Sequence, residues 1–267
     1  MNEMTRPSAL LGPEDPAPVG KVEGSQTSPF LLICDHAGNA VPAALRDLGL
    51  PAAELERHIA NDRGALQVAR RLADRLAAPL IFQRYSRLVI DCNRRPKALD
   101  SIPAVSDGTE VVANRELDEA GRRARLTEIL LPYHRCIEEA LEARAAARQA
   151  TLLVSVHSFT PELRARPTAR PWHLGLCWGH DRRFNDAVLA ALEKQEPDLP
   201  LGRNEPYAVD MEHDYSIPLH AEARNLPYVE FEMRQDLLEG PEAQEAWAER
   251  LERALRQAAD DFLRGGE

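Results

Sequence analysis

The segment TLLVSVHSFTP, residues 151–161, places a histidine at the end of a short apolar run. Five of its first six residues are β-branched or leucine, and the run is too short for a buried helix, which predicts a strand in the middle of a sheet. Ligands of open α/β sheets bind at the strand ends, so His157 and Ser158 are expected to border a crevice. For an isolated histidine, a core position with a hydrogen bond to a backbone carbonyl is the commoner alternative.

A second apolar run, residues 30–34, is followed by another histidine, His36. Two strands that each place a histidine at their end suggest a metal site built across a sheet. Cys34 lies close enough to His36 to raise the alternative of a Cys/His nucleophile. Because Cys34 sits within the predicted strand, we favour the metal site.

Apolar runs of strand length alternate with amphipathic helical patterns along the rest of the chain, which predicts an α/β three-layer domain. Residues 1–28 are rich in Pro, Gly and Ser without periodicity, and we expect them to form a mobile arm before a single domain, residues 29–267. The further predicted strands are residues 79–82, 87–92, 172–178 and 227–234. The predicted helices are residues 65–76, 116–150 with an interruption at Pro132, 181–192 and 242–263.

The composition is ordinary for a soluble globular enzyme, with 44% hydrophobic and 28% charged residues. The net charge of -10 argues against nucleic acid or an anionic membrane as the main partner. The sequence shows neither a membrane-spanning apolar run nor a secretory signal, and its four cysteines form no C-x-x-C pair. We therefore expect a cytoplasmic protein with a small-molecule substrate. The sequence does not indicate its oligomeric state.

Asp62 opens the helical pattern of residues 65–76 and is the candidate third metal ligand. Its alternative role is a helix N-cap, which is common for aspartate. Two histidines and one carboxylate, with a position left for water, form a catalytic zinc arrangement. Such a zinc ion lowers the pKa of its water and polarises a carbonyl group.

Two further predicted strands end in polar side chains that suit the same chemistry. Glu230 and Glu232 are two residues apart and therefore share one face of a strand, either as a buried base with its partner or as a plain solvent-exposed face. Asn93 and Arg94 follow the predicted strand 87–92, and a guanidinium fork matches a carboxylate in a bidentate way. Together these groups predict hydrolysis of an amide bond in a small substrate that carries a carboxylate.

The sequence resembles the N-formylglutamate amidohydrolases over residues 30–238. Each motif is modest alone, but their order along the chain is specific. The motifs are Asp-His-Ala-Gly at 35–38, Asn-Asp-Arg-Gly-Ala at 61–65, the run from 86 to 94, Pro-Tyr-His at 132–134, Val-His-Ser-Phe-Thr-Pro at 156–161, and residues 226–237.

The family is similar in turn to zinc carboxypeptidases and aspartoacylases. The resemblance implies a phosphorylase/hydrolase-like fold, a three-layer α/β/α domain with a mixed, mostly parallel sheet. It also implies one Zn²⁺ on His36 and His157, and Glu232 as the general base. Asn93 and Arg94 match the residues that bind the substrate carboxylate. Ser158 matches the serine that follows the second zinc histidine, and we predict that it also binds substrate. No glutamate follows His36 at ligand spacing, so Asp62 remains an inference from the residues.

The resulting prediction is a zinc-dependent amidohydrolase that cleaves N-formyl-L-glutamate, or a close N-acyl amino acid, to formate and the amino acid. Two alternatives share the chemistry: a deacylase for another N-acyl amino acid and a carboxypeptidase-like hydrolase. A third is a non-catalytic relative that binds a small anion through its arginines without metal.

Overall fold

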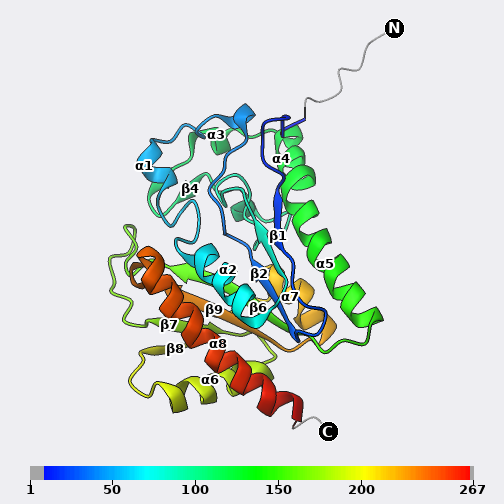
Figure 1. Ribbon diagram of the computed structural model, residues 1–267. Coiled ribbons are helices and arrows are strands. Elements are labelled where there is room, and N and C mark those ends of the chain that lie inside the picture. Colours follow the sequence, from blue (N-terminus) through cyan, green and yellow to red (C-terminus); the bar gives the residue numbers. More distant parts are fainter. Residues whose placement is uncertain (1–8, 265–267) are drawn as a thin grey trace.

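A seven-stranded sheet forms the centre of the computed structural model, which describes residues 9–264 (Figure 1). The strand order is β1-β3-β2-β6-β9-β7-β8. The strands are β1 (Val19–Val22), β2 (Phe30–Cys34), β3 (Leu80–Gln83), β6 (Leu152–Phe159), β7 (Leu174–Cys177), β8 (Leu201–Arg203) and β9 (Tyr228–Arg234).

The sheet is mixed and mostly parallel, as predicted. The central pairs β3–β2, β2–β6 and β6–β9 are parallel, and so is β7–β8. Within the described residues of this sheet, only β1 against β3 and β7 against β9 run antiparallel. The carboxyl ends of β2, β6 and β9 therefore meet at one edge of the sheet, where α/β proteins bind their ligands.

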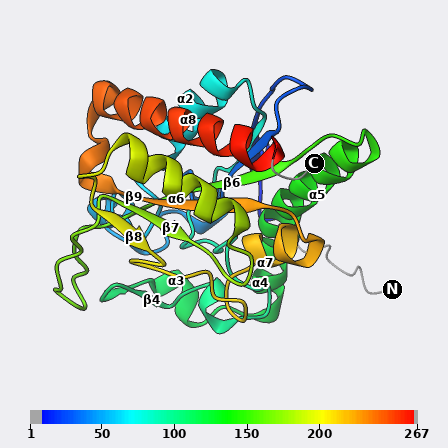
Figure 2. The same cartoon turned by 90° about the horizontal axis from the view of Figure 1, so that it is seen from below.

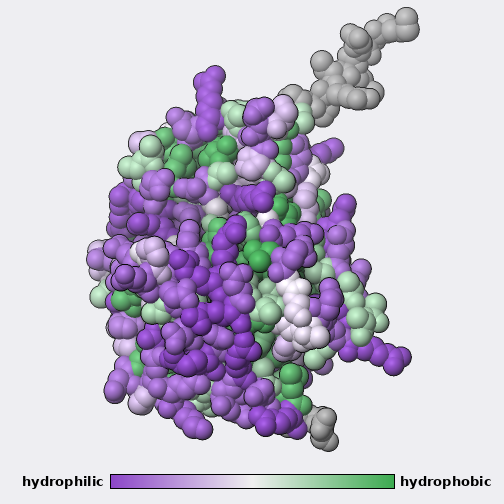
Figure 3. Space-filling model, in the orientation of Figure 1, coloured by the Kyte–Doolittle hydropathy of each residue, from purple (hydrophilic) through white to green (hydrophobic). Residues whose placement is uncertain are grey.

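Helices α2 (Ala65–Leu76), α6 (Arg183–Gln195) and α8 (Gly240–Arg264) cover one face of the sheet (Figure 2). The buried residues of α2 recur three and four positions apart, which forms the apolar stripe expected from its sequence. The outer surface over α2 and α8 is mostly hydrophilic (Figure 3). Between residues 9 and 264, no helix is long and apolar enough to cross a membrane.

The opposite face packs against α5 (Leu131–Ala146), α7 (Ser216–His220) and irregular chain. A π-helical turn, Leu126–Leu130, joins α4 (Glu119–Arg125) to α5 in one continuous rod. Pro132 has no backbone N–H to donate, and the wider turn before it accommodates this loss without ending the helix. The predicted interruption is therefore a local change of helix type. The short elements on this side are α1 (Ala52–Leu55), α3 (Val112–Arg115), β4 (Val105–Ser106) and β5 (Thr109–Glu110).

The prediction that residues 1–28 form a mobile arm is wrong for the part that the structure describes. Val19–Val22 form the edge strand β1, which pairs with β3. A Cβ atom on Gly20 would lie 2.1 Å from the Phe82 ring, so this glycine allows a close approach rather than disorder. Residues 1–8 lie outside the described range.

The run 87–92 is also not a strand. Val89 donates its backbone N–H to Ser86 in a buried turn, and Leu88, Val89 and Ile90 lie in the core on the α5 side of the sheet. An apolar run of this length is compatible with a strand or with any buried segment. The turn allows the side chain of Arg87 to reach the carboxyl edge of the sheet.

We expect the Gly20→Ala variant to unfold at lower denaturant concentration, because the added methyl group meets the Phe82 ring. The loss in free energy of unfolding should be about 1–3 kcal/mol, as for other overpacked cores. Gly12→Ala is the matched control, since its Cβ meets only a flexible carboxylate at 3.6 Å. Equal stability of the two variants would show that β1 does not pack as described.

Candidate metal centre

Sheet register places the second predicted histidine beside the predicted base. His157 of β6 pairs with Glu232 of β9, and Ser155 pairs with Glu230, so all four side chains share the face that packs toward α5. The next strand presents Gly175 opposite Glu232, and the missing side chain lets the backbone carbonyl of Glu205 approach, since a Cβ atom on Gly175 would lie 2.1 Å from that oxygen. The pairing thus brings polar groups from residues far apart in sequence to one end of the sheet.

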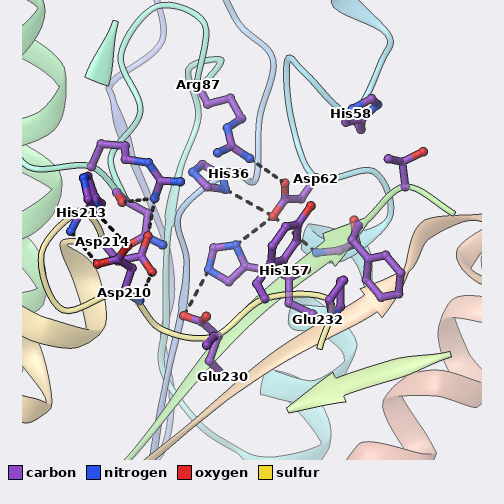
Figure 4. A pocket seen from close by; sticks show the side chains of 18 of the residues that line it. His36, His58, Asp62, Arg87, His157, Asp210, His213, Asp214, Glu230 and Glu232 are labelled. Atoms are coloured by element: carbon purple, nitrogen blue, oxygen red, sulfur yellow. Dashed lines mark hydrogen bonds and ion pairs between the residues drawn. The ribbon is translucent and has the colours of Figure 1, made fainter. Parts of the chain in front are cut away.

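Asp62 joins the two histidines. Its backbone N–H donates to the carbonyl of His36, and its Oδ2 lies 2.8 Å from His157 Nδ1 and 3.4 Å from His36 Nδ1 (Figure 4). One ligand atom from each residue lies within 4.8 Å of the others. Helix α2 begins after Gly64 without a side-chain cap, so Asp62 is not an N-cap. The three residues form a buried cluster that could hold a metal ion.

The far nitrogens of both imidazoles face further polar groups. His36 Nε2 lies 2.8 Å from Asp91 Oδ1, while His157 Nε2 lies 3.0 Å from Ser155 Oγ and 3.5 Å from Asp35 Oδ2. Carboxylates in these positions orient histidine ligands and set their tautomers. Tyr133 of α5 extends this support, because its hydroxyl donates to Asp35 at 2.6 Å.

The carboxylates around the two histidines stabilise positive charge on the imidazole rings. Burial opposes protonation of His157, but its contacts with Asp35 and Asp62 raise its pKa well above the usual range. The pKa of His36 is raised in the same way by Asp91 and Asp62, against the opposing effects of burial and Arg87. A divalent cation on the two Nδ1 atoms supplies the same charge as two protons. The donor set and its surroundings therefore fit a metal ion.

Glu230 and Glu232 lie on a buried face, which excludes the solvent-exposed alternative. They are only 6% and 8% exposed. Burial raises the pKa of Glu230 to about 7 and that of Glu232 to about 8. Oε2 of Glu232 has no hydrogen-bond partner among the described residues. A carboxylate with a raised pKa and an unpaired oxygen is suited to accept a proton.

Arg87 is the main site residue that the sequence reasoning missed. Its guanidinium donates to Asp91 at 2.6 and 3.0 Å. It also lies 3.7 Å from Asp62 Oδ1 (Figure 4). Asp91 thus links the guanidinium of Arg87 to the imidazole of His36. The sequence reasoning did not predict this role of Asp91 either. Because the sequence predicts a strand over residues 87–92, it did not indicate that Arg87 and Asp91 contact the metal-ligand candidates. Arg87 lines the same cavity as the histidines.

The residues predicted to bind substrate all border this cavity but already have protein partners. Asn93 Oδ1 accepts the backbone N–H groups of Tyr215 and Ser216. Ser158 Oγ donates to the carbonyl of Arg63 and thereby holds the chain next to Asp62.

Arg94 bonds to Asp214 and Asp100, and no partner for its Nη2 occurs among the described residues. Only this corner of the guanidinium is open to an incoming anion. The substrate contacts of Asn93, Arg94 and Ser158 remain predictions.

The cavity has a volume of about 570 Å³, in the range of small-molecule sites. His58 and His213 also line this cavity, although no sequence pattern around them indicated a functional role. Cys34, by contrast, is fully buried, and burial raises the pKa of its thiol, so a Cys34 nucleophile has no structural support.

The family model for N-formylglutamate amidohydrolase matches residues 28–239. The chain belongs to the N-formylglutamate amidohydrolase family. No curated protein sequence matches it. Among solved structures, a gene product from Agrobacterium tumefaciens is 34% identical, with a TM-score of 0.90, over 95% of this chain and 99% of that chain. An N-formylglutamate amidohydrolase from Ralstonia eutropha is 21% identical, with a TM-score of 0.64, over 94% of this chain and 100% of that chain.

Two buried histidines, His134 of α5 and His220 of α7, form a neutral pair. His134 Nδ1 lies 2.9 Å from His220 Nε2, and His134 Nε2 lies 2.8 Å from the carbonyl of Cys92. Burial lowers the pKa of His134 and lowers that of His220 to about 3. The pair is therefore neutral in the folded protein at pH values where an unfolded chain binds protons.

We expect this pair to destabilise the metal-free protein as pH falls. Below pH 6.5 the unfolded state protonates His220 while the folded state does not, so stability decreases until about pH 3. At pH 5 the cost relative to pH 7.5 is about 2 kcal/mol from this residue. Urea unfolding at both pH values should show a smaller pH effect in His220→Gln than in the wild type. An unchanged pH effect would contradict the neutral pair.

Proposed function

We propose that this family member is a zinc-dependent amidohydrolase that cleaves N-formyl-L-glutamate, or a close N-acyl amino acid, to formate (or another carboxylic acid) and the amino acid. The observation that supports this most is the convergence of His36, Asp62 and His157 beside the unpaired oxygen of Glu232. The three would hold the ion, and the cavity leaves room for water and an amide.

A zinc ion bound there would acidify water and polarise the carbonyl of the amide. Glu232 would take the proton of the attacking water at Oε2 and deliver it to the leaving nitrogen. Its raised pKa suits both roles, because the carboxyl group accepts and releases a proton near neutral pH. Glu230, one pleat away on the same face, adds negative charge that favours the protonated form of its neighbour.

Arginine side chains would handle the negative charge of the substrate. Arg87 lies beside Asp62 and borders the cavity, so its guanidinium would stabilise the oxygen that becomes negative during attack. Arg94 would offer Nη2 to the substrate carboxylate, with Asn93 holding the neighbouring backbone in place.

The purified protein should release formate from N-formyl amino acids, lose this activity on chelation, and regain it with zinc. Glu232→Gln should lower kcat by at least about 100-fold while zinc stays bound at one equivalent, because only proton transfer is removed. Glu242→Gln, in the exposed first turn of α8, is the control. Wild-type turnover in Glu232→Gln would rule out the assigned role.

Asp91→Asn should weaken zinc affinity by about 10–100-fold, measured by competition with a chelating dye, because the hydrogen bond to His36 Nε2 loses its charge. The exposed Asp198→Asn serves as a control. Equal affinity of the two variants would remove Asp91 from the support of the metal centre.

A further inference from the structure

Arg170 contacts two aromatic residues of the cavity wall, Phe159 and Tyr207. Its Nη1 donates to the hydroxyl of Tyr207 at 2.7 Å. The guanidinium carbon lies 5.0 Å from the centroid of the Tyr207 ring and 5.9 Å from that of the Phe159 ring. Both aromatic residues line the cavity, and cation–π contacts of this kind hold a guanidinium in place. The positive charge of Arg170 therefore lies next to the cavity, although its own side chain does not line it.

Two backbone hydrogen bonds fix the position of Arg170. Its N–H donates to the carbonyl of Pro161 at 3.1 Å, and its carbonyl accepts from the guanidinium of Arg234 at 3.3 Å. Arg234 ends β9, the strand that carries Glu232, and its own backbone N–H bonds to the carbonyl of His173. The loop that ends at Arg170 is therefore attached to the strand that carries the proposed base.

Arg170 differs from the two arginines that line the cavity in the state of its charge. Arg87 is bonded to Asp91, and Arg94 is bonded to Asp214. No carboxylate pairs with Arg170 within the part of the chain that the structure describes, where its side-chain acceptors are the Tyr207 hydroxyl and a backbone carbonyl. Guanidinium groups bind carboxylates through charge-assisted hydrogen bonds. The charge of Arg170 is thus available to an anion in the cavity.

The hydroxyl of Tyr207 has a hydrogen to offer to such an anion. It accepts a bond from Arg170, and no acceptor for its own hydrogen occurs among residues 9–264. Burial and the carboxylate of Glu232 raise the pKa of Tyr207, against the opposing effects of Arg170 and Arg87, so the phenol stays protonated at neutral pH. Hydrogen bonds in a chain polarise one another, so the bond from Arg170 strengthens the hydroxyl as a donor. Tyr207 is therefore a polarised donor near both Glu232 and Arg87.

We propose that Tyr207, polarised by Arg170, binds a second carboxylate of the substrate, in addition to the one that Arg94 would bind. Tyr207 is then a substrate-binding residue, and Arg170 is a positioning residue that acts through the Tyr207 hydroxyl. A substrate with two carboxylates engages both positions, whereas a substrate with one carboxylate engages only one of them. This inference rests on the proposed amidohydrolase function and deepens it, because it names the residues that select dicarboxylic substrates.

The test compares N-formyl-L-glutamate with its two monoamides, N-formyl-L-glutamine and N-formyl-L-isoglutamine, each of which lacks one carboxylate and keeps the shape. Tyr207→Phe and Arg170→Gln should each raise KM for N-formyl-L-glutamate about tenfold, with a smaller change in kcat, because a charge-assisted hydrogen bond is lost. The increase should persist for one monoamide and vanish for the other. Arg94→Gln should show the reverse pattern.

Three results would overturn the inference. The first is an unchanged KM in Arg170→Gln. The second is an equal rise in KM for all three substrates, which indicates a structural role. The third is the same pattern in Arg94→Gln and Arg170→Gln, which places both arginines at one carboxylate.

Two further variants separate charge from packing. Arg166→Gln removes an exposed positive charge from the same loop and should leave every KM unchanged. Arg170→Lys keeps the charge and should retain part of the affinity that Arg170→Gln loses. Equal losses in the lysine and glutamine variants would contradict an electrostatic role of Arg170.

Binding of glutarate, a dicarboxylate without an amide bond, separates this inference from the proposed function. Calorimetry on the protein as purified should show about tenfold weaker binding in Arg170→Gln than in the wild type, with Arg166→Gln as the control. Equal binding in all three proteins would overturn the inference, even in an active enzyme. No hydrolysis of any N-formyl compound would overturn the proposed function, and glutarate binding would still decide the role of Tyr207 and Arg170.

Discussion

The shared carboxylate of Asp62 is the constraint on which the site depends. Isolated charges in a protein interior are costly, and they persist only when opposite charges and hydrogen bonds compensate them. Asp62 Oδ2 faces both His36 Nδ1 and His157 Nδ1, and Asp35 and Asp91 face the far nitrogens. Each imidazole is thus held between two carboxylates. The arrangement fixes the direction in which both Nδ1 atoms point, which is what a metal site requires.

The sheet supplies the remaining geometry. In-register pairing of β6 with β9 sets Glu232 beside His157, and Gly175 on β7 lies opposite that carboxylate, where it allows close approach of the Glu205 backbone. Burial on this face raises the pKa of Glu232. The same backbone pairing therefore determines both the position of the base and its affinity for a proton. The helices behind the face contribute Tyr133, which fixes Asp35 by a hydrogen bond.

Sequence periodicity predicted the strand that precedes His36 and the strands that carry His157 and Glu232, because apolar runs of strand length have few other interpretations when they alternate with helices. The position of Asp62 was ambiguous, since a carboxylate at a helix start can cap the helix or turn away from it. Arg87 was missed because a buried turn and a buried strand have the same composition, and only the fold distinguishes them. The strand β1 was missed because residues 1–28 are rich in Pro, Gly and Ser without periodicity, a pattern typical of disorder, whereas Gly20 within it allows contact with Phe82.

The central claim is that His36, Asp62 and His157 bind one zinc ion. X-ray absorption at the zinc edge of the protein loaded with one equivalent tests it most directly. The account predicts two imidazole nitrogens at about 2.0–2.1 Å with carboxylate and water oxygens at similar distance, and loss of one imidazole in His157→Ala. A sulfur shell near 2.3 Å, or an unchanged spectrum in that variant, would contradict it.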